Sequence, residues 1–165
     1  MRVPRILVAY DSRTGNTEKM AQAVAKGAES VPGMTVVLKK ATRTTPQDLL
    51  RADGIILGSP TYYGLMSAKL KDLIDRSVKV HGKLEGKVGA AFTSAGGTAT
   101  GAETTLLSIN QALLVHGMVV RGRSDNKHYG AAGTGAPNRE TLKYCRELGE
   151  RTARMVLAMQ SGKDS

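Results

Sequence analysis

The stretch YDSRTGNT, from Tyr10 to Thr17, decides the fold because it joins a strand pattern to a helix pattern. The apolar run ILVA at residues 6–9 precedes it, and apolar residues at helical spacing follow it. Gly15 lets the backbone approach a ligand closely, and hydroxyl groups come from Ser12, Thr14 and Thr17. Because the first N–H groups and the positive dipole end of the following helix face this turn, the stretch predicts a cradle for a phosphate group.

Two common nucleotide-binding loops do not match residues 10–17. One requires a lysine after its second glycine, and the other requires the glycine spacing G-x-G-x-x-G. A second interpretation also stays open for this loop, because Gly, Ser, Thr and Asn are frequent in ordinary turns and helix caps. Other parts of the chain therefore have to decide whether the loop binds a ligand.

The chain alternates short apolar runs with helical patterns, which is typical of a parallel sheet covered by helices on both faces. The expected strands are residues 5–10, 34–38, 54–58, 88–93 and 118–121. The expected helices are residues 16–30, 46–51, 67–77, 102–116 and 138–159, and residues 122–137 are expected to form a long loop. A length of 165 residues fits one α/β domain over residues 1–165.

Glycine-bearing loops follow the first, third and fourth expected strands. The second loop reads SPTYYG at residues 59–64, and the third reads SAGGTATG at residues 94–101. In a parallel sheet these loops leave the same edge, and in the strand order 2-1-3-4-5 the first two flank the point where the order reverses. Ligands bind at that point in doubly wound sheets, so we expect the three loops to form one site.

Composition restricts the class of partner. The chain has 24 Lys and Arg residues against 14 Asp and Glu residues, and its formal charge of +10 favours anionic ligands or acidic partner proteins. The basic residues are scattered and aromatic residues are few, so a solvated basic surface is favoured over specific nucleic-acid binding. With no long apolar run and no apolar segment after Met1, we expect a cytoplasmic protein without a membrane span. Cys145 is the single cysteine, and no Cys/His cluster indicates a metal.

Three further stretches match one family. They read GSPTYYGLMSAKLKDLID at residues 58–75, GKLEGKVGAAFTSAGG at residues 82–97 and ALLVHGMVVRG at residues 112–122. They resemble the flavodoxin-like FMN proteins of the WrbA type, which are NAD(P)H:quinone oxidoreductases. This resemblance implies a flavodoxin-like three-layer α/β sandwich, a five-stranded parallel sheet in the order 2-1-3-4-5, and FMN as cofactor.

The resemblance also implies the residues around FMN. Its phosphate is expected at Ser12, Thr14, Gly15, Asn16 and Thr17, its ring along Pro60, Thr61, Tyr62, Tyr63 and Gly64, and the far side of the ring at Ser94, Ala95, Gly96, Gly97 and Thr98. Arg13 is expected to assist the phosphates of a nicotinamide nucleotide. His116 and Tyr129 are expected beside the flavin, although a helix C-terminal cap would explain His116 equally well.

The chain departs from the WrbA pattern in two ways. Its phosphate loop is closer to that of ordinary flavodoxins, and it lacks the extra segments after the second and fifth strands that help to build the family's tetramer. We therefore keep a homo-oligomer as an expectation and leave the activity open. An oxidoreductase would pass electrons from NAD(P)H through the flavin N5 to a quinone without any catalytic side chain. A one-electron carrier would instead dock an acidic redox partner, and a scaffold would bind FMN without turnover.

Overall fold

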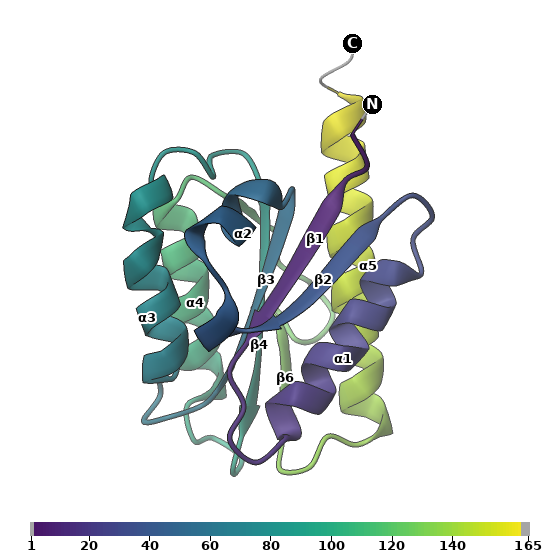
Figure 1. The fold of residues 1–165 in the computed structure, drawn as a ribbon. Helices are drawn as coiled ribbons and strands as arrows, with labels where there is room; N and C mark the ends of the chain where they lie inside the picture. Colours follow the sequence, from purple (N-terminus) through teal and green to yellow (C-terminus); the bar gives the residue numbers. More distant parts are fainter. Residues whose placement is uncertain (1, 163–165) are drawn as a thin grey trace.

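The computed structural model describes residues 2–162 and has one parallel sheet between two layers of helices (Figure 1). The order along the sheet is β2-β1-β3-β4-β5, and every pair of neighbouring strands is parallel. The strands in that order are β2 (Thr35–Lys40), β1 (Arg5–Tyr10), β3 (Gly54–Pro60), β4 (Val88–Ala95) and β5 (Val119–Val120). The predicted fold class and strand order are confirmed.

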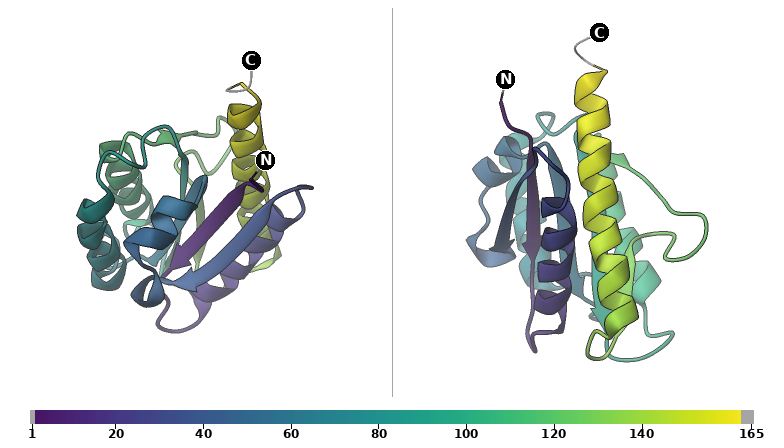
Figure 2. Two further views of the ribbon diagram at one scale, coloured as in Figure 1. Left: turned by 45° about the horizontal axis from the view of Figure 1, so that its top comes forward. Right: turned by 90° about the vertical axis from the view of Figure 1, so that its right-hand side faces the viewer.

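The helices divide between the two faces of the sheet. One face carries α1 (Asn16–Glu29) and α5 (Arg139–Ser161), and the other carries α2 (Pro46–Arg51), α3 (Ala68–Arg76) and α4 (Ala102–Val115), with short 3₁₀ helices at Ala41–Arg43 and Ser77–Val80 (Figures 1 and 2). Side chains of β1 alternate between two buried clusters, because successive residues of a strand point to opposite faces. Within residues 2–162, none of the helices is long and apolar enough to cross a membrane.

Two predicted helix starts carry the expected caps. Thr45 Oγ1 accepts a hydrogen bond from the Asp48 N–H, and the Asp48 carboxylate accepts one from the Thr45 N–H. Asn138 Oδ1 accepts from the Thr141 N–H at 2.8 Å. These bonds occupy N–H groups that have no acceptor within their own helix, so both helices begin where the sequence indicates.

The end of the sheet differs from the prediction. A sixth strand, β6 (Ala131–Thr134), lies inside the segment expected to be a loop and pairs with β4 in parallel. Since β5 pairs with Val88 and Gly89 and β6 pairs with residues 92–95, the two short strands share one side of β4. Residues 121–130 between them project from the body beside α5 (Figure 2). The prediction of a continuous loop over residues 122–137 is therefore wrong.

Helices α1 and α5 cross at two glycines. A Cβ atom added to Gly27 would lie 1.9 Å from the backbone oxygen of Arg146, and one added to Gly149 would lie 1.9 Å from the backbone oxygen of Val24. Both distances are far inside van der Waals contact, so the two backbones approach more closely than any side chain would permit. This crossing fixes α5 against α1, and the two helices together form one layer of the sandwich.

Candidate functional site

The loops after β1, β3 and β4 leave the carboxyl edge of the sheet, which is the lower edge in Figure 1. The Thr17 and Ser94 hydroxyl oxygens lie 2.7 Å apart and are buried, which connects the first turn of α1 to the end of β4. The Thr61 N–H donates to the Ser94 carbonyl at 2.7 Å, which connects the second loop to the same residue. The three loops thus form one structural unit.

The first loop presents N–H groups and hydroxyl groups at the start of α1. Ser12 Oγ accepts hydrogen bonds from the Gly15 and Glu18 N–H groups, both at 3.2 Å. Gly15 has a left-handed backbone (φ 95°), and a Cβ atom added there would have no neighbour within 4 Å. The space beside the helix start is therefore open, and two backbone donors share a single hydroxyl acceptor.

The carboxylate of Glu18, in the first turn of α1, is engaged by a side chain of β1. The Tyr10 hydroxyl donates to Glu18 Oε1 at 2.6 Å. Burial, together with the bond to Glu18, raises the pKa of Tyr10 to about 12, so the phenol keeps its proton and remains a donor. One carboxylate oxygen of Glu18 is consequently held on Tyr10.

The second loop makes a tight turn that exposes two tyrosines. Tyr62 and Leu65 exchange backbone hydrogen bonds of 3.0 and 3.1 Å. Between them, Tyr63 (φ 51°) and Gly64 (φ 75°) are both left-handed, which is the pattern of a type I′ turn. Tyr62 is 39% exposed and Tyr63 is fully exposed. A left-handed tyrosine is unfavourable, and such strain is frequent at functional sites.

The third loop packs on the second. A Cβ atom added to Gly101, at the start of α4, would lie 2.6 Å from the Gly64 Cα atom. The Thr61 and Thr93 hydroxyl oxygens lie 2.9 Å apart, and Thr93 donates to the Ser59 carbonyl. A Cβ atom added to Gly96 would have no neighbour within 4 Å, so the backbone of this loop borders open space. The predicted residues of all three loops are thus brought together.

Two features of this edge were not predicted. The Gly135 N–H donates to the Ala95 carbonyl at 2.8 Å, so the loop after β6 reaches the same edge as a fourth segment. A hollow lies between the first and second loops, and it is lined by Asp11, Arg13, Tyr62, Ser67, Ala68 and Lys69. The fourth segment depends on β6, whose four residues, AAGT, carry too little apolar pattern to predict a strand.

His116 and Tyr129 do not lie with the three loops. Helix α4 begins at the carboxyl edge and extends about 21 Å, so His116 at its end lies at the opposite edge of the sheet. Tyr129 precedes β6, and its carbonyl accepts from Asn110 Nδ2 midway along α4 at 2.9 Å. The structure therefore does not bring these two residues together with the three loops within a single chain.

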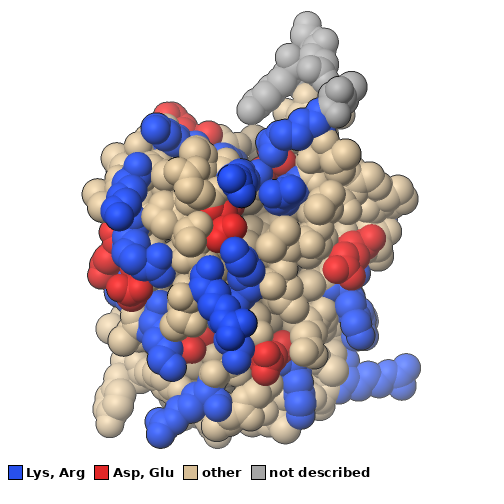
Figure 3. All heavy atoms as spheres, in the orientation of Figure 1, with Lys and Arg blue, Asp and Glu red and all other residues tan. Residues whose placement is uncertain are grey.

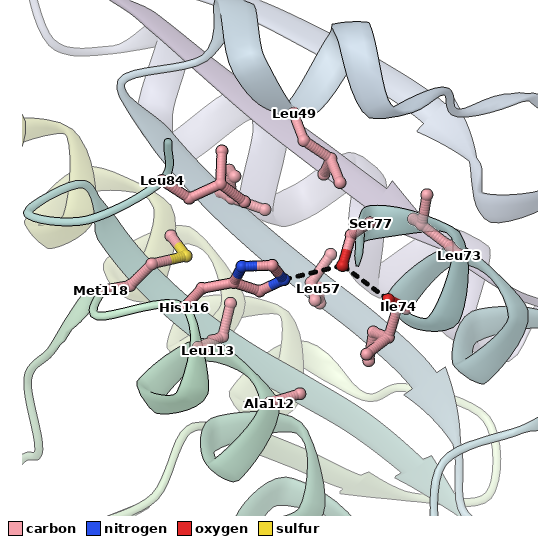
Figure 4. A pocket seen from close by; sticks show the side chains of 11 residues that line it. Leu49, Leu57, Leu73, Ile74, Ser77, Leu84, Ala112, Leu113, His116 and Met118 are labelled. Carbon is pink, nitrogen blue, oxygen red and sulfur yellow. Dashed lines mark hydrogen bonds between the residues drawn. The ribbon is translucent and has the colours of Figure 1, made fainter. Parts of the chain in front are cut away.

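His116 instead closes a small apolar pocket between α3 and α4 (Figure 4). Its Nε2 atom lies 2.7 Å from Ser77 Oγ, which also bonds to the Ile74 carbonyl. Burial lowers the pKa of His116, and the charge of nearby His81 lowers it further. The ring is a packing element at the end of α4. Its hydrogen bond goes to Ser77 and its Nδ1 atom has no partner among residues 2–162, so the ring does not bind the helix carbonyls as the helix-cap interpretation expected.

Comparison with known proteins identifies the family. The sequence profile of the NADPH-dependent FMN reductase family matches residues 32–127, more than half of the chain. The chain belongs to this family. A flavodoxin of Aquifex aeolicus is 42% identical over 96% of this FMN reductase-family chain and 90% of its own length. An NAD(P)H dehydrogenase (quinone) of Archaeoglobus fulgidus is 37% identical over 92% of the chain and 97% of its own length.

Solved structures agree with this assignment. The flavodoxin, WrbA-like protein from Agrobacterium tumefaciens superposes with a TM-score of 0.80 at 26% identity, covering 94% of this chain and 99% of that one. A flavodoxin from the domain Archaea superposes with a TM-score of 0.77 at 28% identity, covering 93% and 99%. The resemblance to the flavodoxin-like FMN proteins of the WrbA type is confirmed.

Proposed function

We propose that this protein is an FMN-dependent oxidoreductase that transfers electrons from NAD(P)H to a quinone or a similar small acceptor. The observation that carries the proposal is the meeting of three loops at one sheet edge, through Thr17, Ser94 and Thr61. The similarity to the Archaeoglobus quinone dehydrogenase along nearly the whole chain supports the choice of activity.

The first loop fits the phosphate of FMN. Its donors are hydroxyl groups and helix-start N–H groups, which suit a dianion. Residues 12–17 contain Arg13 as their one charged side chain and no carboxylate. The open space at Gly15 leaves room beside these donors. Ser12 Oγ accepts hydrogen bonds from the Gly15 and Glu18 N–H groups. A phosphate oxygen would accept these two hydrogen bonds in its place, so the Ser12 hydroxyl would take another partner when FMN binds.

The other two loops fit a flat ring. Tyr62 and Tyr63 supply aromatic surface at the tip of a rigid turn, and Gly96 borders open space on the third loop. The turn that carries the tyrosines also contains Pro60, Thr61 and Gly64. The third loop, which contains Gly96, also contains Ser94, Ala95, Gly97 and Thr98. Backbone N–H groups at such glycines can approach the ring closely because no Cβ atom intervenes.

When bound, FMN would supply the redox chemistry, accepting electrons from the nicotinamide nucleotide and passing them to the acceptor. The residues of this chain bind and orient the cofactor, and no side chain has to take or give a proton. Arg13 and Lys69 line the hollow beside the second loop, where their charges would attract the phosphates of NAD(P)H. The Asp11 carboxylate in the same hollow opposes this attraction.

The overall charge favours an anionic co-substrate. Basic side chains are spread over the face that carries β2 and α2, with acidic ones between them (Figure 3). At a formal charge of +10, the protein would raise the local concentration of NAD(P)H and repel a basic protein partner. This attraction of NAD(P)H arises from the total charge of the protein and does not require a concentrated basic patch.

A one-electron carrier is the second candidate, and the 42% identity to a flavodoxin favours it. Such a carrier would use the same edge to hold FMN and would exchange electrons with an acidic redox protein. The two candidates therefore share the cofactor site and differ in whether a nicotinamide nucleotide reacts there.

Anaerobic reduction separates the two candidates. FMN-loaded protein is mixed with excess NADH or NADPH, the flavin spectrum is followed, and benzoquinone is then added. Rapid bleaching followed by turnover supports the oxidoreductase. A flavin indifferent to both nucleotides, with a stable one-electron-reduced spectrum on stepwise dithionite addition, supports the carrier, and failure to bind FMN contradicts both.

A further inference from the structure

The interruption between β5 and β6 leaves the middle of β4 without a partner on that side. Val88 and Gly89 pair with β5, pairing with β6 begins at Phe92, and Ala90 and Ala91 lie between. A gap at this position is lined by Gly89, Ala90, Arg121, Arg151 and Thr152. Two arginines thus meet where the sheet is broken, one from the projecting segment and one from α5.

Arg151 is half-buried and has no carboxylate partner among residues 2–162. Its Nη1 atom donates to the Gly122 carbonyl at 3.1 Å, which anchors the start of the projecting segment to α5. Burial lowers its pKa, the positive charges of Arg123 and Arg121 lower it further, and the carboxylates of Asp125 and Glu147 offset only part of this shift. A partly desolvated guanidinium with no carboxylate in direct contact is unfavourable, and a bound anion would stabilise it.

The carboxylates nearby are engaged by another residue. Arg123 makes a bidentate ion pair with Asp125, with distances of 2.6 and 2.9 Å, and also contacts Glu147. Among residues 2–162, neither Arg121 nor Arg151 makes an ion pair with a carboxylate. Neither arginine therefore has a carboxylate in direct contact among these residues, and the nearby carboxylates are held by Arg123.

We propose that Arg121 and Arg151 form a binding site for a phosphate-type oxyanion, either free phosphate or the phosphate group of a larger metabolite. The same two side chains line a second, more open hollow together with Gly122, Arg123 and Ser124. An anion can reach them from solvent through this hollow, and Ser124 offers a hydroxyl donor beside them. The bound anion would tie the projecting segment to α5.

The chemistry favours phosphate over a carboxylate ligand. Two guanidinium groups present planar pairs of N–H donors, and a tetrahedral dianion can accept from both groups while matching their combined charge. A monocarboxylate would leave one positive charge in excess. Arg151 lies twelve residues into α5, about 18 Å along the helix from the carboxyl edge. The site is thus separate from the proposed FMN site and does not depend on it.

Calorimetric titration with inorganic phosphate and with pyrophosphate tests the proposal, at an ionic strength held constant with sodium chloride. Both are titrated into wild type and into Thr14→Glu, whose phosphate loop is expected to be blocked, so that anion binding at the first loop is excluded. Arg121→Gln is the main variant, because Arg121 is exposed and its substitution is expected to leave the fold intact. Arg154→Gln is the control, since Arg154 is an exposed arginine of the same helix paired with Glu150.

We expect binding of at least one probe in wild type and in Thr14→Glu, about tenfold weaker binding in Arg121→Gln, and unchanged binding in Arg154→Gln. Stronger binding of phosphate would indicate a single phosphate group, free or esterified, and stronger binding of pyrophosphate would indicate a diphosphate such as that of a nucleotide. Absence of binding for both probes, or equal affinity in Arg121→Gln and wild type, would overturn the proposal. Binding lost only in Thr14→Glu would also overturn it, because that result would assign the anion to the first loop.

Discussion

The hydroxyl oxygens of Thr17 and Ser94 lie 2.7 Å apart in the interior, although the two residues are 77 positions apart in the chain. Thr17 is 2% exposed and Ser94 is 8% exposed, so neither hydroxyl has ready access to water. This bond joins the first turn of α1 to the end of β4 and makes the two outer loops of the candidate site one unit. A buried hydroxyl that loses its partner costs about 1–3 kcal/mol.

We predict that Thr17→Val and Ser94→Ala each lower the free energy of unfolding by about 1–2 kcal/mol. The loss of unfolding free energy in the double variant should be smaller than the sum of the two single losses, because the second substitution removes a hydroxyl that is already unpaired. Urea unfolding of all four proteins measures the coupling. Thr98→Val, at an exposed position of the third loop, is the control and should be nearly neutral. Additive losses would mean that the two hydroxyls do not interact.

The first loop leads to a prediction about cofactor binding. Thr14→Glu places a carboxylate among the donors expected to hold the FMN phosphate, and repulsion between like charges should weaken FMN binding by roughly a hundredfold or more. Titration of flavin fluorescence gives the affinity. Thr35→Glu makes the same charge change on an exposed residue at the start of β2, at the opposite edge, and should bind FMN like wild type. Equal affinity in Thr14→Glu and wild type would show that the FMN phosphate does not bind at this loop.

The strand order and the three loops were predictable because they depend on local patterns. Apolar runs followed by glycine-bearing turns indicate parallel strands, and parallel strands bring their loops to one edge. The same logic, carried one step further, would have placed His116 correctly. A helix that begins at the carboxyl edge ends at the opposite one, so a residue at the end of α4 cannot border loops at its start.

Other features depend on contacts that no local pattern reveals. The strand β6 consists of four small residues, and only its pairing with β4 defines it. Gly149 interrupts an otherwise good helical pattern. A glycine is needed there because the backbone of Val24, on another helix, leaves no room for a Cβ atom. In both places tertiary packing overrides the local preference of the residue.

Gly149 leads to a prediction whose sign separates packing from propensity. Helix propensity alone predicts that Gly149→Ala stabilises α5 by about 1 kcal/mol. The structure predicts the opposite, because the new Cβ atom would lie 1.9 Å from the Val24 oxygen and 2.8 Å from the Ala28 nitrogen. We expect a loss of about 3 kcal/mol as α1 and α5 are forced apart. Thermal and urea unfolding measure the change, with Lys143→Ala on the exposed side of α5 as the control, and a stabilised Gly149→Ala would refute the close crossing.

Cys145 makes stability depend on pH in the alkaline range. The residue is fully buried, and burial raises the pKa of its thiol from 9.0 to about 12. In the unfolded chain the thiol ionises near pH 9, so above that pH the unfolded state releases a proton that the native state retains. The contribution of the protonated Cys145 thiol to the free energy of unfolding is therefore complete below pH 9 and is lost as the pH rises toward 12. At pH 10 the loss amounts to about 1.4 kcal/mol.

Urea unfolding at pH 8 and pH 10 checks this prediction in wild type and in Cys145→Ala. The variant begins less stable because it leaves a small cavity. Between the two pH values, however, wild type should lose about 1.4 kcal/mol more than Cys145→Ala. Tyr10, whose pKa burial and the Glu18 bond raise to about 12, is present in both proteins, so its contribution cancels in the comparison. If both proteins lose the same free energy, the Cys145 thiol ionises as readily in the native state as in the unfolded one.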